Sequence, residues 1–159
     1  MARWEDVVAS EPEFAGAVQA FFDAHRHKTL ATLRADGAPR ISGIEASFIE
    51  GEVWFGGMWR SRKLLDLQRD GRFALHSASE DPPRWKGDAK IMGRAEETAD
   101  EAAKQALVGA SGGEVPSGPW HLFRADISEV VMVRLGDPAD HLVIELWREG
   151  EELSRTTRR

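Results

Sequence analysis

Hydrophobic and polar residues along the chain change their spacing after a short N-terminal segment, and this change separates helix from strand. Apolar residues first recur at the three- or four-residue spacing of an amphipathic helix, at Phe14, Val18, Phe21 and Phe22. The preceding Ser10-Glu11-Pro12-Glu13 has the pattern of a capping box, with proline in the first turn. The pattern predicts a helix that ends near His25–His27.

After this helix the spacing becomes two residues, which indicates β-strands. In the segment 40–49, for example, Ile44, Ala46 and Phe48 fall on one face. The connections between the first strands are short, and short connections favour antiparallel hairpins. The predicted strands are Thr29–Arg34, Arg40–Ile49, Glu52–Trp59, Arg72–Ser79, Asp88–Glu97, His121–Leu135 and His141–Arg148.

Two further helices interrupt the strands. Ser61 is a good N-cap for a leucine-containing segment that Gly71 ends. Thr98-Ala99-Asp100-Glu101 has the pattern of a second capping box and opens an alanine-rich helix that reaches about Ala110. The segments 80–87 and 111–119 are rich in glycine and proline and are predicted as loops.

About seven strands and three helices in this order predict a mainly β fold with helices (α+β), in which antiparallel strands form a closed or split β-barrel. Helices do not alternate with strands, so a doubly wound α/β fold is disfavoured. A chain of 159 residues fits one domain. We expect residues 1–27 to form an N-terminal helical segment and residues 149–159 to form a C-terminal tail, whose basic end Arg155–Arg159 is solvated and frayed.

Composition excludes several classes of function. The chain has no cysteine, so it has no disulfide, thiolate metal site or cysteine nucleophile. Its net charge of −6 argues against nucleic acid as a main partner, because phosphate backbones require a basic surface. The N-terminus lacks the apolar stretch of a signal peptide, and no apolar run approaches the roughly 20 residues that cross a bilayer. We therefore expect a soluble cytoplasmic protein with no membrane partner.

The segment Gly56–Lys63 carries the most chemical information. Helix N-termini disfavour cations by about 0.3–1 kcal/mol each, yet Arg62 and Lys63 lie in the first turn of a predicted helix. An anion bound to the free N–H groups, the Ser61 hydroxyl and these cations would reverse that cost, as in a phosphate site. Alternatively both cations point into water and Gly56-Gly57 forms a bulge, and spacing alone does not decide between the two.

Other candidate chemistry is weaker. Glu45 lies in an otherwise apolar strand, where it is either a proton relay or an edge-facing charge. The sequence has no GxGxxG or GxxxxGKS nucleotide motif. Its five histidines lack metal-ligand spacing, so we expect no metal site. No side chain stands out as a catalytic acid or base.

Several segments occur in an order that matches a known family: Lys28–Leu33, Asp36-Gly37, Pro39–Ser42, Val53–Gly56 and Ser61-Arg62-Lys63. This order resembles the pyridoxamine 5'-phosphate oxidase-like, FMN-binding split-barrel superfamily of flavin and deazaflavin oxidoreductases. The similarity runs from about His25 to Glu97 and more loosely through Leu122–Leu135, and Ser61-Arg62-Lys63 is its most specific part.

The resemblance implies a cofactor site. It implies that Arg62, Lys63 and Ser61 hold the phosphate of FMN. The residues implied to lie along the flavin ring and its tail are Arg40, Ile41, Ser42, Phe55 and Gly56. The family builds its sites between two subunits, so a homodimer is expected. The residues implied to reach the partner's cofactor are His76, Ser77, Trp85 and Lys86, and Trp147 resembles an aromatic residue that packs near the flavin.

The implied activity is hydride transfer between FMN and a small organic substrate. Oxidation of pyridoxamine phosphate itself is not expected, because the chain has no tyrosine and ends without the arginine-containing C-terminal segment of the true oxidases. Three alternatives stay open: a deazaflavin coenzyme in the same groove, a non-enzymatic flavin- or haem-binding protein, and a barrel with an empty groove. The lack of tyrosine and cysteine axial ligands disfavours haem.

Overall fold

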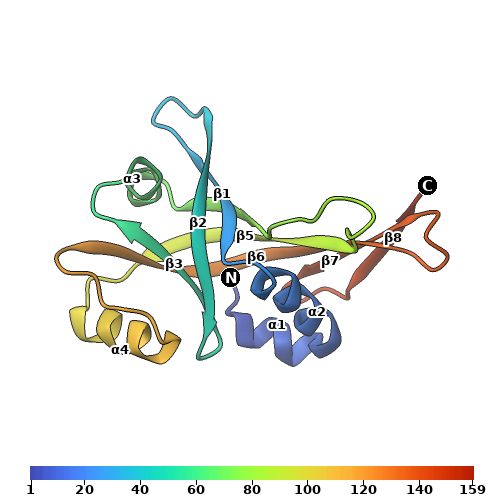
Figure 1. Cartoon of the computed structure of the whole chain (residues 1–159), viewed down its shortest axis with the longest axis horizontal. Coiled ribbons are helices and arrows are strands. Elements are labelled where there is room, and N and C mark those ends of the chain that lie inside the picture. The colour runs from blue at the N-terminus through green and yellow to red at the C-terminus, as the bar shows by residue number, and fades with distance from the viewer.

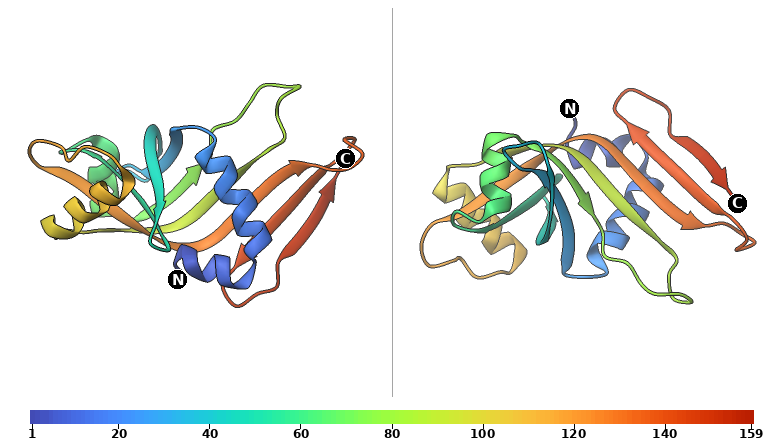
Figure 2. Two further views of the ribbon diagram at one scale, coloured as in Figure 1. Left: turned by 60° about the horizontal axis from the view of Figure 1, so that its bottom comes forward. Right: turned by 90° about the horizontal axis from the view of Figure 1, so that it is seen from above.

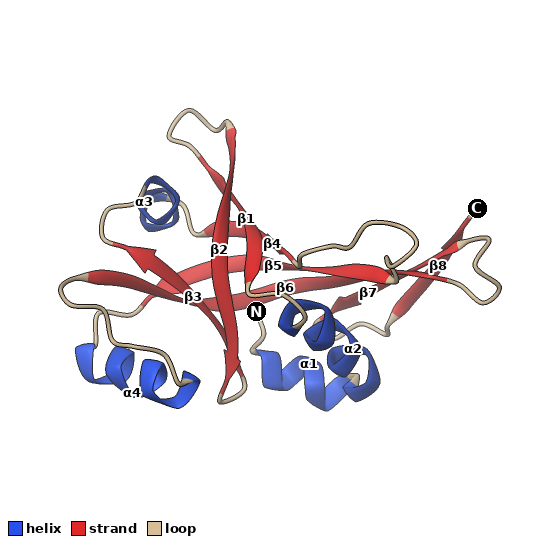
Figure 3. Ribbon diagram, in the orientation of Figure 1, coloured by secondary structure: helices blue, strands red, loops and turns tan.

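A computed structural model describes residues 1–159 and contains one eight-stranded antiparallel sheet (Figures 1 and 3). The strand order is β3-β2-β1-β4-β5-β6-β7-β8, and β3 also pairs with β6. This extra pairing closes β1 to β6 into a barrel, from which β7 and β8 extend as a wing. The strands are β1 His27–Leu33, β2 Pro39–Ile49, β3 Glu52–Met58, β4 Arg72–His76, β5 Gly87–Glu97, β6 Trp120–Leu135, β7 Leu142–Arg148 and β8 Ser154–Arg158.

Four helices flank the sheet: α1 Trp4–Ser10, α2 Pro12–Asp23, α3 Arg62–Arg69 and α4 Glu101–Ser111. Helices α1 and α2 pack against the part of the sheet that leads into the wing, whereas α4 lies at the opposite end of the molecule (Figures 1 and 2). No helix is long and apolar enough to cross a membrane. The predicted split-barrel fold with flanking helices is confirmed, with one strand and one helix more than expected.

The barrel interior is filled by the inward faces of its strands. Ile44 and Ala46 are buried on β2, as the alternation predicts. Phe55 of β3 lies at the centre, with its ring 5.1 Å from that of Phe73 and 6.5 Å from that of Phe123. Hydrophobic burial of this kind is the main force that holds a barrel closed.

Gly56 permits the closure of the barrel between β3 and β6. It pairs in regular register with Glu45 on β2 and Leu122 on β6. A Cβ atom at this position would lie 2.2 Å from the carbonyl oxygen of His121, so only glycine allows the two strands this close. Gly56-Gly57 is therefore part of a regular strand, and the alternative of a bulge is wrong.

The ends of the chain differ from expectation. A helix, α1, precedes the predicted one, and Ser10 ends it instead of capping α2, whose N-cap is Glu11 without a side-chain hydrogen bond. Residues 154–158 form β8 on the edge of β7, although a frayed tail was expected. Elsewhere Asp100, and not Thr98, caps α4 by accepting hydrogen bonds from the N–H groups of Ala102 and Ala103.

Candidate functional site

The connection from β3 to α3 contains several polar groups without hydrogen-bond partners. Ser61 is the N-cap of α3 as predicted, but its hydroxyl oxygen is buried and has no hydrogen-bond partner. The N–H groups of Leu64 and Leu65 both donate to the Ser61 carbonyl, at 3.0 Å each. The N–H groups of Arg62 and Lys63, two residues earlier, have no acceptor within the chain. This helix start therefore offers three unpaired polar groups to a ligand.

An arginine-rich cavity of about 490 Å³ lies between α3 and the β1–β2 turn. Residues at positions 62, 65, 66 and 69 of α3 form one wall, because helical residues three and four apart share a face. Four arginines and two aspartates line the cavity, which gives it a net charge of +2 (4 − 2). The charged lining residues are Arg34, Asp36, Arg40, Arg62, Asp66 and Arg69. A cavity of this sign favours an anion.

Asp66 holds two of these arginines in place. Its carboxylate accepts hydrogen bonds from Arg40 Nε at 2.6 Å, Arg69 Nη2 at 3.3 Å and the Thr32 hydroxyl at 2.8 Å. Burial raises the pKa of the Asp66 carboxyl, but the hydrogen bonds from Arg40, Thr32 and Arg69 lower it by more, so the pKa lies below its usual range. Arg34 and Arg62 form no ion pair and are the cations left for a bound anion.

Arg62 and Lys63 point to different sides of the helix start. Arg62 lines the arginine-rich cavity, whereas Lys63 Nζ donates a 2.7 Å hydrogen bond to the Gly43 carbonyl on β2. The aliphatic part of Lys63 passes close to Gly57. The structure thus places both cations beside the N-terminus of α3, as predicted, but on either side of it.

His121 braces the same connection, and sequence reasoning missed it. Its side chain is only 1% exposed, and Trp59 stacks on the ring with centroids 4.5 Å apart. The His121 Nδ1–H donates to Glu97, and Nε2 accepts a 3.1 Å hydrogen bond from the N–H of Arg60. Arg60 has a left-handed φ of 60° that this bond helps to hold. In the sequence His121 is one of five histidines without metal spacing, and nothing there signals its role.

Glu97 completes the brace. Burial raises the pKa of its carboxyl, but hydrogen bonds from His121 and Gln68 lower it by more, so the pKa lies below the usual range. An ionised Glu97 accepts the Nδ1–H of His121 and leaves Nε2 free to accept from Arg60. The chain Glu97–His121–Arg60 therefore orients the backbone that leads into Ser61.

Three predicted ring-contact residues lie on the barrel strands beside this site. Ile41 is exposed on the outward face of β2, and Ser42 is half-buried between its neighbours. Gly56 faces outward on β3. Phe55, by contrast, is buried in the barrel core, and its ring faces inward because β3 alternates with Gly56 outward.

The residues implied to reach a partner's cofactor gather at the far end of β4 and the start of β5. His76 Nε2 lies 3.6 Å from Asp88 Oδ1, and Trp85 Nε1–H donates to Asp88 Oδ2 at 3.4 Å. The buried Ser77 hydroxyl accepts a 3.0 Å hydrogen bond from the N–H of Ala89, and Lys86 is exposed. None of them lines the arginine-rich cavity of its own chain.

Trp147 lies in the core and away from these residues. It is 2% exposed, and its indole Nε1–H donates a 2.8 Å hydrogen bond to the Ser10 hydroxyl at the end of α1. It occupies the face of β7 that α1 and α2 cover, together with the buried Glu145. The structure therefore places this tryptophan in a structural position and does not bring it to the site.

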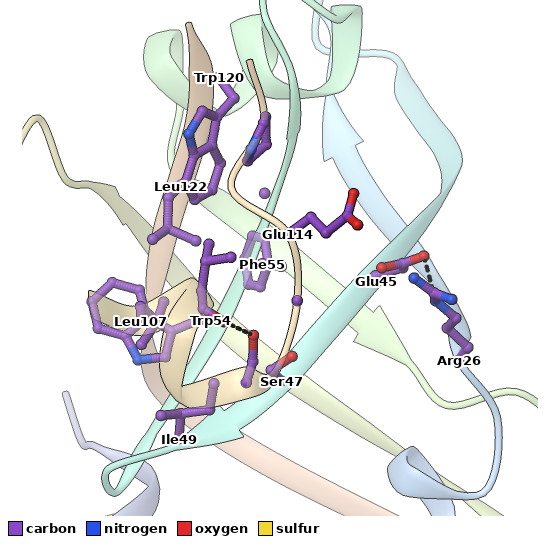
Figure 4. Close-up of a pocket in the computed structure, with 15 residues that line it drawn as sticks. Arg26, Glu45, Ser47, Ile49, Trp54, Phe55, Leu107, Glu114, Trp120 and Leu122 are labelled. Atoms are coloured by element: carbon purple, nitrogen blue, oxygen red, sulfur yellow. Dashed lines mark hydrogen bonds and ion pairs between the residues drawn. The ribbon is translucent and has the colours of Figure 1, made fainter. Parts of the chain in front are cut away.

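A second cavity, of about 250 Å³, lies between α4 and the outward faces of β2, β3 and β6 (Figure 4). Glu45 stands at its edge and accepts a 2.8 Å hydrogen bond from Arg26 Nε. The outward alternation of β2 brings Glu45 opposite Gly56, so this cavity adjoins the strand positions described above.

Several solved structures have a fold similar to that of this chain. A pyridoxamine 5'-phosphate oxidase-related, FMN-binding protein from Nostoc punctiforme superposes with a TM-score of 0.65 and 17% identity over 100% of this chain and 98% of that one. A protein of unknown function from Agrobacterium tumefaciens gives 0.59 and 17% over 74% of this chain, which spans 56% of that protein. A heme binding protein from Mycobacterium smegmatis gives 0.59 and 19%, over 89% of this chain and 57% of that one.

At these identities the similarity shows the fold alone, and no curated protein sequence matches the chain. A family model described as pyridoxamine 5'-phosphate oxidase matches residues 14–134, from α2 through β6. The match includes α3 and every residue that lines the two cavities. Because it covers well over half of the 159 residues, the chain belongs to the pyridoxamine 5'-phosphate oxidase family.

Proposed function

We propose that this protein is a flavin-dependent oxidoreductase that binds FMN and transfers a hydride between it and a small organic substrate. The observation that carries the proposal is the buried, unpartnered Ser61 hydroxyl at the N-terminus of α3, beside the unpaired Arg62. A buried polar group without a partner costs about 1–3 kcal/mol, and a phosphate oxygen at this position would satisfy it.

The phosphate would be held from several directions. Three donors lie at the helix start: the N–H groups of Arg62 and Lys63 and the Ser61 hydroxyl. The helix dipole also favours negative charge there. Arg62 and Arg34 add positive charge from the arginine-rich cavity, and Lys63 does so from the other side. The residues present therefore fit a phosphate-bearing cofactor.

The ring system would lie on the outward face of β2 and β3. Two of the six exposed large apolar side chains are found there, with exposed fractions of 74% for Ile41 and 79% for Met58. Clustered exposed apolar side chains mark a binding surface. A side chain added at Gly43 would meet no atom within 4 Å, so this part of β2 leaves room for a flat molecule. When bound, the flavin supplies the hydride chemistry, and this chain supplies position and electrostatics.

A second copy of the chain would cover another apolar face. On the outward side of β6 and β7, Val131 pairs with Leu146 and Val133 with Ile144, and all four are partly exposed. Helices α1 and α2 pack on the other side of these strands. His76 pairs with Lys90, which pairs with Val131, so the cluster around Asp88 borders this face. We propose a homodimer in which this cluster approaches the partner's cofactor.

The decisive experiment is a titration of the purified protein with FMN and with a deazaflavin coenzyme, followed by mass spectrometry of what copurifies. The double variant Arg62→Ala/Lys63→Ala should weaken FMN binding at least about tenfold, because each charged hydrogen bond contributes about 1.5–3 kcal/mol. Arg94→Ala/Arg158→Ala removes two exposed cations that form no ion pair and serves as the control. Equal affinity of the two double variants would refute the phosphate assignment.

The same titration separates the alternatives. A deazaflavin coenzyme carries a phosphate that suits the same cations. The measured affinities for the two cofactors therefore decide which of them the protein prefers. An absorption spectrum with a Soret band would contradict the flavin proposal in favour of haem. Pyridoxamine phosphate oxidation is not proposed, because the chain has no tyrosine to help bind that substrate.

A further inference from the structure

Apolar residues form seven of the 15 lining positions of the cavity beneath α4. Trp54 of β3, Trp120 and Leu122 of β6, and Leu107 and Val108 of α4 surround it (Figure 4). Its volume of about 250 Å³ exceeds the roughly 150 Å³ that accommodates a benzene molecule. The cavity therefore has room for a single ring with a short substituent.

The charged groups at the rim set the sign of the ligand. Glu45 and Glu114 contribute two negative charges and Arg26 one positive charge, so the net charge of the lining is −1 (1 − 2). Arg26 is already bonded to Glu45, which leaves Glu114 uncompensated. This is opposite in sign to the arginine-rich cavity, and it disfavours an anionic ligand.

The α4 wall is held in place before any ligand binds. Lys104 is buried, and its Nζ donates a 2.7 Å hydrogen bond to the Trp120 carbonyl while it lies 5.3 Å from the centroid of the Trp120 ring. The Asp100 cap fixes the start of the helix. A preformed pocket that combines apolar side chains with polar groups is the usual form of a small-molecule site.

The position of the cavity connects it to the proposed flavin. The outward-facing residues of β2 include Ile41, Glu45 and Ser47, and successive residues on one face of a strand lie about 7 Å apart. A flavin with its phosphate at α3 and its ring over Ile41 would extend along these strands toward Gly56, which lines the cavity. The ring and the cavity contents would then meet on one face of the sheet.

We infer that this cavity is the substrate pocket and that it takes a small, uncharged or cationic single-ring molecule without an anionic group. The substrate role rests on the proposed flavin function. The ligand preference rests on the cavity alone and is testable in protein without cofactor.

Three probes of similar size separate the charge classes: benzyl alcohol, benzamidinium and benzoate, each titrated by ligand-observed NMR. Benzyl alcohol and benzamidinium should bind at least about tenfold more tightly than benzoate. Ser47→Phe fills the cavity from β2 and should abolish this binding, whereas Ala106→Phe adds the same ring to the exposed face of α4 and should preserve it. Benzoate binding as tightly as the others, or equal binding to both variants, overturns the inference.

A second variant covers the case in which Ser47→Phe does not fold. Leu107→Ala enlarges the cavity and should raise the affinity for 2-naphthylmethanol relative to benzyl alcohol, and an unchanged ratio contradicts the inference. FMN titration of the same preparations distinguishes the two proposals. FMN binding without ring binding overturns the pocket alone, whereas ring binding without FMN binding supports the ligand site and overturns the flavin function.

Discussion

At the scale of single residues, Asp66 links stability to the charge of the proposed phosphate site. Its carboxylate is buried and accepts hydrogen bonds from Arg40, Arg69 and Thr32. Because the folded-state pKa lies below the unfolded value of 3.8, the ionised form stabilises the fold above that pH. This contribution is lost as pH falls through the folded-state pKa.

We predict that Asp66→Asn lowers the free energy of unfolding at pH 7 by about 1–3 kcal/mol, since the partly buried arginines lose a charged acceptor. The difference from wild type should shrink when urea unfolding is repeated at pH 3. Asp81→Asn, in an exposed loop, is the control. A difference that stays the same at both pH values would show that the charge of Asp66 is not the cause.

The residue scale also shows what the sequence reveals. The cations Arg62 and Lys63 were predictable at a helix start, because the cap and the leucine spacing are local signals. Their separation to two sides was not, since Lys63 meets Gly43 on β2, 20 residues away along the chain. The pairing of Arg40 with Asp66 spans 26 residues and likewise depends on the closed barrel.

At the scale of elements, the brace between β6 and the β3–α3 connection positions the site. We predict that His121→Phe, which keeps an aromatic ring under Trp59, lowers the free energy of unfolding by about 1–3 kcal/mol because Arg60 and Glu97 lose their partner. The affinity for inorganic phosphate should fall as well. His27→Phe, at the exposed first residue of β1, is the control. Reduced stability with unchanged phosphate affinity would limit His121 to a structural role.

Elements with strong local signals were predicted, and those that depend on neighbours were not. The alternation on β2 identified its buried face before the fold was known. Helix α1 has seven residues, too few for a stable isolated helix, and depends on the burial of Trp4 and Val7. β8 is exposed along its whole length and exists because β7 offers an edge to pair with. The sequence of residues 154–158 alone does not predict this pairing.

At the scale of the whole molecule, the chain presents two unlike surfaces on its strands. The outward face of β2 and β3 leads from the arginine-rich cavity to the cavity beneath α4, whose rim is acidic. The outward face of β6 and β7 is apolar and uncovered by helices. A closed two-fold dimer would use such a face on both copies, because the same patch meets itself in an isologous interface.

We predict a dimer of about twice 17.7 kDa by light scattering, and a monomer for Ile144→Asp, which places a charge in the centre of the outward β6–β7 face. Ala110→Asp on exposed α4 is the control and should remain dimeric. If the partner's residues complete the cofactor site, dissociation must also weaken FMN binding, because binding and assembly are thermodynamically linked. FMN affinity of the wild type would then fall on dilution below the dimer dissociation constant. A monomeric Ile144→Asp with full FMN affinity would show that each chain holds the cofactor alone.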